Sequence, residues 1–401
     1  PPTSNMRHVD GPEAEGRTVS SSGPTRITDV RALAVRVPLA RPVRLATRLV
    51  EAREYVLVWI EAADGTVGIG HAYAGTRGGR ILRDLVLELF RPVLVGADAT
   101  LIDHLWTALY QEALLLGRRG AVLRALSAVD IALWDRLGIA TGLPLYRLLG
   151  GDRAEVPAYA SGGYYSEGDP LAIVERELRG HVEAGFDAVK IKVGRDFAID
   201  VERVRVARDA LGPDRRLALD ANNAWRSPHE AIRFARAVER YDPWWLEEPL
   251  PADDIAGHAA VARALDLPVA TGEIHATRWD FAALIEQRAA DILQPDASVV
   301  GGVSEWLKVA HLAAAANLPV APHWDHALHV HLAAAVGNCL GVEFFFLAGD
   351  VYNFDSLIRE DVRLSPVEGR LTVPQRPGVG IVLDEAAVKR FRIDDGRVPS
   401  R

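Results

Sequence analysis

Lysine and cysteine are scarce in this chain of 401 residues, and long apolar runs are absent. The single cysteine, Cys339, excludes an internal disulfide and is typical of a reducing compartment, so we expect a cytoplasmic protein. No run of about 18 apolar residues could span a membrane. Acidic residues outnumber basic ones by 54 to 46, giving a net charge of −8, which argues against a nucleic-acid partner and leaves only local basic patches open. Only four of the 46 basic residues are lysines, and two of these, Lys190 and Lys192, lie two positions apart.

Common nucleotide-binding and nucleophile motifs are also missing. The run Gly68-Ile69-Gly70-His71 lacks the third glycine of a dinucleotide-binding loop, and neither a P-loop nor a nucleophile elbow occurs. The composition is 49% hydrophobic and 25% charged, which is ordinary for a globular protein and excludes general disorder. The length fits one barrel of about 250 residues together with an accessory domain.

Four segments can be distinguished along the chain. Residues 1–25 are rich in small and polar types without an apolar period, which predicts a flexible leader that lacks the apolar core of a secretory signal. Residues 26–150 contain strand-like runs followed by helical patterns, which predict an α+β domain. Residues 151–346 have an alternating pattern, and residues 347–401 do not, so we expect this last segment to return to the N-terminal domain.

The alternating segment, residues 151–346, combines short apolar runs with helical stretches. From the second run onward the runs end 20 to 28 residues apart, the length that a strand, a helix and two loops require. Eight such repeats predict an α/β fold with a (β/α) barrel, whose chemistry lies at the carboxyl ends of the strands. The runs end near Ala160, Lys192, Asp220, Glu247, Glu273, Asp296, His323 and Glu343.

Three carboxylates end consecutive predicted strands: Asp220, Glu247 and Glu273. Adjacent barrel strands lie about 4.8 Å apart, so inward-facing side chains at one level can converge. Three converging carboxylates repel one another unless a cation lies between them, and oxygen ligands without cysteine favour Mg²⁺. Either Glu247 or Glu248 could be the ligand, because neighbours on a strand face opposite ways. Asn222, two residues beyond Asp220, could reach the metal or substrate, or could equally cap a loop.

The two lysines of the 188–193 run share one face of a strand, because residues two apart point the same way. Both ammonium groups would therefore enter the barrel mouth. A like-charged neighbour and partial desolvation each favour the neutral amine, which a catalytic base requires. The sequence therefore predicts that Lys190 and Lys192 take part in catalysis.

The ends of the last three runs supply further candidates. Asp296 and His323 would form a dyad in which the carboxylate fixes the tautomer of the imidazole and raises its basicity. Glu343 lies in an apolar run, where a carboxyl is costly unless it is paired or protonated. A protonated Glu343 could donate a hydrogen bond to a developing oxyanion.

Two further groups of residues are open to more than one interpretation. Arg41, Arg44 and Arg48 lie in a polar link where they could bind a carboxylate, although a solvated loop is the simpler interpretation in so arginine-rich a chain. His326, His329 and His331 come after His323 in a helical pattern, which favours a solvated or packing role over a metal cluster.

Taken together, these motifs resemble the mandelate racemase subgroup of the enolase superfamily over nearly the whole chain after the leader. The resemblance implies a modified (β/α)₇β TIM-type barrel, residues 151–346, with an α+β capping domain built from residues 26–150 and 347–401. A signature helix spans residues 130–135. The other matching elements are Lys190-Ile191-Lys192, Asp220-Ala221-Asn222, Glu247-Glu248-Pro249, Gly272-Glu273, Pro295-Asp296 with Gly301-Gly302, Pro322-His323 and Glu343.

The resemblance also implies a division of roles among the site residues. Asp220, Glu247 and Glu273 would bind Mg²⁺, which would hold a substrate carboxylate. Lys192 would remove the proton alpha to that carboxylate, and His323, backed by Asp296, would act on the opposite face. Lys190 would neutralise the carboxylate, and Glu343 would hydrogen-bond the enediolate.

Removal of this proton is compatible with more than one overall reaction. Protonation of a departing hydroxyl by His323 would make the protein a dehydratase of an acid sugar, whereas reprotonation of carbon would make it a racemase of a 2-hydroxyacid. A barrel that binds a carboxylate without turnover is the third alternative. Residues 160–165 resemble a tartrate-type dehydratase, and Tyr164, Tyr165 and the loop that carries Arg44 suit a polyhydroxylated anion. We expect a small-molecule carboxylate as partner, no nucleic acid or membrane, and, from the resemblance, a homo-oligomer.

Overall fold

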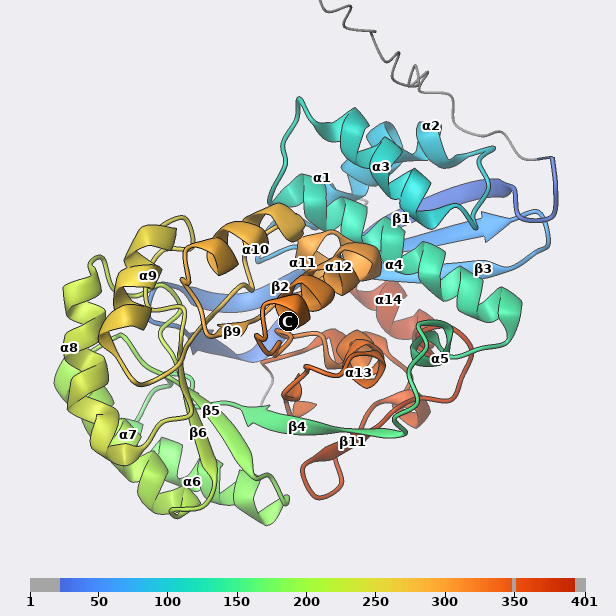
Figure 1. The fold of residues 1–401 in the computed structure, drawn as a ribbon. Coiled ribbons are helices and arrows are strands. Elements are labelled where there is room, and N and C mark those ends of the chain that lie inside the picture. The colour runs from blue at the N-terminus through green and yellow to red at the C-terminus, as the bar shows by residue number, and fades with distance from the viewer. Residues whose placement is uncertain (1–21, 348–350, 394–401) are drawn as a thin grey trace, which may run out of the picture.

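A computed structural model of the protein describes residues 22–347 and 351–393. It contains a three-stranded antiparallel sheet with helices packed on it and a curled parallel sheet surrounded by helices (Figure 1). Most of the predicted leader, residues 1–21, lies outside the described part of the chain. Among the described helices, none combines the length and apolar character needed to cross a membrane.

The N-terminal domain begins with an antiparallel sheet in the order β1-β2-β3. Both partner strands pair with Tyr55 of β2, which lies opposite Val35 of β1 and Tyr73 of β3. The apolar residues on one face of this sheet pack on the helices that come after it in the chain. The elements are β1 (Ile27–Arg44), β2 (Leu49–Ala62), β3 (Val67–Tyr73), α1 (Gly79–Asp84), the π-helix η1 (Leu85–Phe90), α2 (Arg91–Leu94), α3 (Ile102–Ala113), α4 (Ala121–Thr141) and α5 (Leu145–Leu148).

Strand β3 and helix α4 pack with almost no space between their backbones. A Cβ atom on Gly70 would overlap the carbonyl oxygen of Ala128, and one on Gly68 would overlap that of Ala132. The two glycines therefore allow the close approach of helix to sheet. This packing accounts for the glycine run that does not match a nucleotide-binding loop.

The second sheet forms the barrel in the strand order β10-β4-β5-β6-β7-β8-β9. Seven of the eight predicted strands are present. The run that ends at His323 forms only isolated bridges, from Val320 to Leu293 on one side and to Cys339 on the other. The elements are β4 (Glu155–Ser161), α6 (Pro170–Glu183), β5 (Ala188–Lys192), α7 (Phe197–Leu211), β6 (Arg216–Asp220), α8 (Pro228–Val238), η2 (Glu239–Tyr241), β7 (Trp245–Glu247), α9 (Ile255–Ala264), β8 (Val269–Thr271), α10 (Thr277–Glu286), β9 (Ile292–Leu293), α11 (Ala297–Val300), α12 (Gly302–Ala315), α13 (His326–Ala335) and β10 (Val342–Phe344).

The lumen of the barrel is filled by an apolar layer beneath a charged one. The apolar layer includes Ala188, Ala218 and Trp245. Because side chains alternate along a strand, the residues two positions further on face the lumen as well. These are Lys190, Asp220 and Glu247, so the period of the strand brings charged groups to the carboxyl end of the barrel.

The C-terminal segment touches both parts of the molecule. Strand β11 (Arg370–Thr372) pairs antiparallel with β4, and the amide of Ile393 donates to the carbonyl of Ala34 in β1. The remaining elements of this segment are η4 (Phe354–Leu357), η5 (Glu360–Val362) and α14 (Glu385–Phe391).

Candidate active site

The structure brings the three predicted carboxylates together at the carboxyl end of the barrel. Asp220 and Glu247 are opposite one another in the β6–β7 register, and Glu273 lies two residues beyond the end of β8. Each residue offers a carboxylate oxygen within 4.8 Å of those of the other two. Asp220 and Glu247 are completely buried.

The electrostatics of this triad fit a bound hard cation. Burial and the neighbouring carboxylates together raise the pKa of Glu247 to about 8 against the opposing effect of Lys190. One buried oxygen of Glu273 has no hydrogen-bond partner. A set of three converging carboxylates, in which one oxygen has no hydrogen-bond partner, is suited to Mg²⁺.

Glu248, the alternative ligand, is outside the triad. It is buried, and neither of its carboxylate oxygens has a hydrogen-bond partner. Its backbone has φ of 42°, in the left-handed region. Burial, followed by the charges of Glu273 and Asp220, raises its pKa well above the ordinary value. Glu247, the last residue of β7, therefore belongs to the triad, and the turn that begins at Glu248 directs that residue away from it.

Lys190 and Lys192 both point into the barrel, but each is paired with acids. Nζ of Lys190 lies 2.5 Å from Oε1 of Glu247 and 2.8 Å from Oε1 of Glu343, and Nζ of Lys192 forms an ion pair with Asp220. Burial alone would lower the pKa of Lys192, but the Asp220 carboxylate outweighs it and raises the pKa above the ordinary value. The sequence-based expectation is that each lysine favours the neutral amine. With only the protein's own groups present, this expectation is wrong, because the adjacent carboxylates stabilise the ammonium form more than the like-charged neighbour destabilises it.

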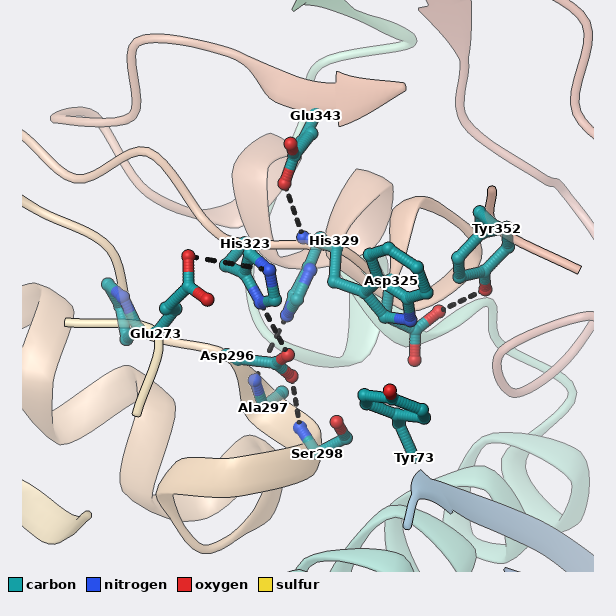
Figure 2. A network of polar contacts seen from close by, with 12 residues as sticks. Tyr73, Glu273, Asp296, Ala297, Ser298, His323, Asp325, His329, Glu343 and Tyr352 are labelled. Carbon is teal, nitrogen blue, oxygen red and sulfur yellow. Dashed lines mark hydrogen bonds and ion pairs between the residues drawn. The ribbon is translucent and has the colours of Figure 1, made fainter. Parts of the chain in front are cut away.

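His323 lies on the other side of the triad and is held by Asp296 (Figure 2). Its Nδ1 lies 3.0 Å from Oδ2 of Asp296, and its Nε2 lies 3.6 Å from Oε2 of Glu273. Asp296 is in turn fixed as the N-cap of α11 by the amide of Ser298, at 2.7 Å. Burial opposes the charged imidazole, but Glu273 and Asp296 outweigh it and raise the pKa of His323 to about 9.

Glu343 is the middle residue of β10 and faces Lys190. Besides Lys190, it binds the amide of Trp324, which donates to Oε2 at 2.9 Å. Burial would raise its pKa, but Lys190 outweighs burial and holds the pKa below its usual range. The carboxyl of Glu343 is therefore ionised and paired, whereas a hydrogen-bond donor role requires the protonated form.

The three predicted substrate-binding residues occupy different surroundings. Asn222 is buried beside the triad, where its amide donates to Asp220 at 3.2 Å and its Oδ1 has no partner. The hydroxyl of Tyr165 instead donates to Asp200 at 2.8 Å, which commits it to a structural contact. Arg44 is exposed, and its backbone pairs with that of Tyr165.

Three further aromatic or basic residues surround these groups, and two of them, Trp324 and Arg53, were not predicted. The ring of Tyr164, not that of Tyr165, lies 4.9 Å from Nζ of Lys192. Trp324 has φ of 76° and stacks on His323 with ring centroids 5.8 Å apart. Arg53, on β2 of the other domain, lies over Trp324. Tyr164 is predicted with Tyr165 to suit a polyhydroxylated anion and Trp324 follows His323 in sequence, whereas nothing in the strand pattern around Arg53 indicated it.

The histidines after His323 are buried in α13 and do not form a metal cluster. His326 pairs with Asp355, the amide of Ala297 donates to Nε2 of His329, and His331 binds the carbonyl of Val379. The packing role is therefore correct and the solvated one is wrong, because α13 is covered by other elements on every side that carries a histidine.

Two protein families match the chain. Residues 27–150 match the family described as Mandelate racemase / muconate lactonizing enzyme, N-terminal domain. Residues 174–387 match the family described as Enolase C-terminal domain-like.

Curated relatives are similar over most of their length. L-talarate/galactarate dehydratase of Salmonella typhimurium is 36% identical over 382 residues, covering 93% of each protein. Arabinonate dehydratase of Saccharolobus solfataricus is 34% identical over 345 residues, covering 84% of this chain and 91% of the relative. 3,6-anhydro-alpha-L-galactonate cycloisomerase of Streptomyces coelicolor is 36% identical over 371 residues, covering 92% and 99%.

Solved structures of similar proteins contain magnesium. A racemase from Streptomyces coelicolor with bound magnesium has a TM-score of 0.86 and 34% identity, over 91% of this chain and 99% of that one. The Salmonella typhimurium L-talarate/galactarate dehydratase liganded with Mg and L-lyxarohydroxamate has a TM-score of 0.84 and 34% identity, over 92% and 93%. With its two matching domains, its modified barrel and its carboxylate triad, the chain belongs to the mandelate racemase subgroup of the enolase superfamily and is an enzyme of the lyase or racemase type.

Proposed function

We propose that the protein is a Mg²⁺-dependent dehydratase that converts an acid sugar into a 2-keto-3-deoxy acid. The observation that carries the proposal is the placement of a lysine and a histidine on either side of the carboxylate triad. Lys192 contacts Asp220 at one end of it, and His323 contacts Glu273 at the other. A base and an acid that flank one bound carboxylate can act on opposite faces of the carbon next to it.

The bound Mg²⁺ would supply Lewis acidity that makes the proton alpha to the substrate carboxylate removable. Lys192 would take this proton at Nζ as the neutral amine, a form that becomes favourable when a cation on Asp220 offsets the carboxylate charge that holds the ammonium. Lys190, held between Glu247 and Glu343, would place a fixed positive charge beside the same carboxylate. His323 would deliver a proton from Nε2 to the departing beta-hydroxyl, and Asp296 would keep the proton on Nδ1 in place.

Racemisation or cycloisomerisation is the second candidate. The similar proteins include a cycloisomerase and a racemase as well as dehydratases, and the same lysine–histidine pair could exchange a proton on carbon. The two outcomes differ only in whether His323 protonates oxygen or carbon.

Product analysis distinguishes these candidates. The protein is incubated with Mg²⁺ and a panel of aldonates and aldarates, and 2-keto acids are measured with a carbonyl reagent. We expect a 2-keto acid from at least one acid sugar. No keto acid across the panel, together with racemisation of any 2-hydroxyacid, would overturn the dehydratase proposal.

Exchange in D₂O tests for turnover of any kind and assigns the base. We expect His323→Asn to lose dehydration while it retains deuterium exchange at the alpha carbon, and Lys192→Ala to lose both. Exchange that survives Lys192→Ala but is lost in His323→Asn would identify His323 as the base and contradict the role proposed for Lys192. If the protein exchanges no substrate proton but binds the acid, it is a carboxylate-binding barrel.

We further propose a cytoplasmic location and a homo-oligomeric state, to be tested by fractionation and light scattering.

A further inference from the structure

Two arginines of the N-terminal domain meet at Tyr73, the last residue of β3. Arg53 donates from Nη1 to the Tyr73 hydroxyl at 2.9 Å, and its guanidinium lies 5.3 Å from the centroid of that ring. Arg124 of α4 donates from Nη1 to the carbonyl of Tyr73 at 2.8 Å. Two cations are thus brought to one residue by two different elements.

Neither cation has an acid partner within the described part of the chain. Across residues 22–347 and 351–393, the structure places no carboxylate at ion-pair distance from Arg53 or Arg124; their hydrogen bonds go to carbonyls and a hydroxyl. Arg53 is only 4% exposed. The equally buried Arg136 and Arg203, by contrast, pair with Asp64 and Asp200. A buried charge without a counter-charge is costly, and an anionic ligand would offset that cost.

Both arginines lie against Tyr73, and Arg53 also contacts the residue next to His323. The Arg53 guanidinium lies 4.3 Å from the ring centroid of Trp324, which stacks on His323 and on Tyr73. Figure 2 shows Tyr73 on the same side of His323 as the Asp325 segment. The Arg124 guanidinium lies 5.8 Å from the centroid of the Tyr73 ring, and Asp296 and Glu273 are among the groups that favour its charged form against burial, which lowers its pKa.

We propose that Arg53 and Arg124 form a subsite for a second carboxylate of the substrate, so that the enzyme acts on diacids (aldarates) in preference to monoacids (aldonates). The subsite rests on the proposed function, since it assumes that the first carboxylate binds at the Asp220–Glu247–Glu273 triad. Planar guanidinium groups match the geometry of a carboxylate. An aldonate presents an uncharged hydroxymethyl group at this end and would leave both cations without a counter-charge.

Binding of matched acids tests the subsite independently of turnover. Galactarate and galactonate, and further aldarate–aldonate pairs, are titrated by calorimetry in the presence of Mg²⁺ against the Lys192→Ala protein, which stops the reaction. Arg53→Met and Arg124→Met are each introduced into this protein. The control is Arg147→Met, because Arg147 also stacks on a tyrosine and hydrogen-bonds its hydroxyl, at 5.2 Å and 3.0 Å, but lies on α5.

We expect the Lys192→Ala protein with both arginines intact to bind the aldarate of each pair more tightly than the aldonate. Each arginine variant should weaken aldarate binding about 10- to 100-fold, the range for a lost hydrogen bond between charged groups, while aldonate binding changes by less than about threefold. Arg147→Met should change neither. If Arg53→Met fails to fold, as judged by thermal unfolding, Arg124→Met provides the independent measurement.

Three results would overturn the subsite: tighter binding of the aldonate, equal weakening of both acids in the arginine variants, or no binding of any aldarate. Turnover by the unsubstituted enzyme distinguishes failure of the subsite from failure of the proposed function. Dehydration of aldonates alone would leave the dehydratase proposal standing and remove the subsite. Arginine-dependent aldarate binding without any dehydration would support the subsite and overturn the dehydratase proposal.

Discussion

His71 of β3 and Asp325 of the barrel form a buried pair, with 2.6 Å between Nε2 and Oδ2. Asp325 also accepts a hydrogen bond from the Tyr352 hydroxyl at 3.1 Å and caps α13 (Figure 2). It lies two residues after His323, and the intervening Trp324 has a backbone in the left-handed region. The pair therefore ties the sheet of the N-terminal domain to the turn that carries the proposed general acid.

We expect Asp325→Asn to lower the free energy of unfolding by about 3 kcal/mol, because it breaks a buried pair and leaves its partners unsatisfied. Burial would raise the pKa of Asp325, but His71 outweighs burial and lowers it. A folded-state pKa below the unfolded value means that the stabilisation is present above about pH 4 and is lost as the pH falls further. Denaturant unfolding at several pH values measures this. Asp361→Asn, which removes an exposed partner of Arg359, is the control and should cost less than about 1 kcal/mol. Equal losses in both variants would contradict the interpretation.

The pH dependence of turnover should track the ionisation of His323. As a general acid it must be protonated, and because Asp296 raises its pKa, kcat/KM should fall only as the pH rises above the ordinary range of histidine. Asp296→Asn removes a carboxylate that stabilises the imidazolium, so the pKa of His323 falls and the alkaline limb moves to lower pH by about one unit or more. Ser298→Ala is the control, since the backbone amide that binds Asp296 remains. If the alkaline limb of the kcat/KM profile stays at the same pH in Asp296→Asn, the Asp296–His323 dyad is contradicted.

Mg²⁺ should stabilise the fold through the carboxylate triad. Saturation at about 100 times the dissociation constant adds about 2.7 kcal/mol, because the ion binds the folded state alone. Thermal unfolding with and without Mg²⁺ measures this as a shift in Tm. Glu247→Gln should lose the shift, and Glu175→Gln, a substitution in an exposed pair on α6, should retain it. A shift that persists in Glu247→Gln would place the ion elsewhere.

The close contact between β3 and α4 predicts a steep cost for one added methyl group. Gly70→Ala should lower the free energy of unfolding by about 3 kcal/mol or more, because its Cβ would overlap the backbone of α4. Gly180→Ala in α6, where a Cβ meets nothing within 4 Å, should be neutral or stabilising by up to about 1 kcal/mol. The two midpoints in denaturant provide the comparison, and similar values would show that β3 and α4 can separate.

Local pattern and spacing were enough to predict the barrel and its charged mouth. Side chains alternate along a strand with a fixed period, so the positions of Lys190, Lys192, Asp220 and Glu247 relative to their strands are determined by the sequence. Regular crossovers of 20 to 28 residues bring the strand ends to one level. The run before His323 differs from the predicted strand, because Val320 makes only isolated bridges there.

Tertiary structure alone decided which acid faces which base and which distant residues join the site. The ion pairs that set the protonation of Lys192 and Glu343 arise between strands, so their opposing effects on pKa depend on distances that no local pattern contains. Arg53 and His71 reach the barrel mouth from a separate sheet, at sequence separations above 190 residues from Trp324 and Asp325. The sequence by itself determined the chemical groups and their order around the barrel. Ion pairs between barrel strands determined their charge states, and packing of the N-terminal domain against the barrel determined which distant residues lie beside them, because both depend on distances in the folded chain.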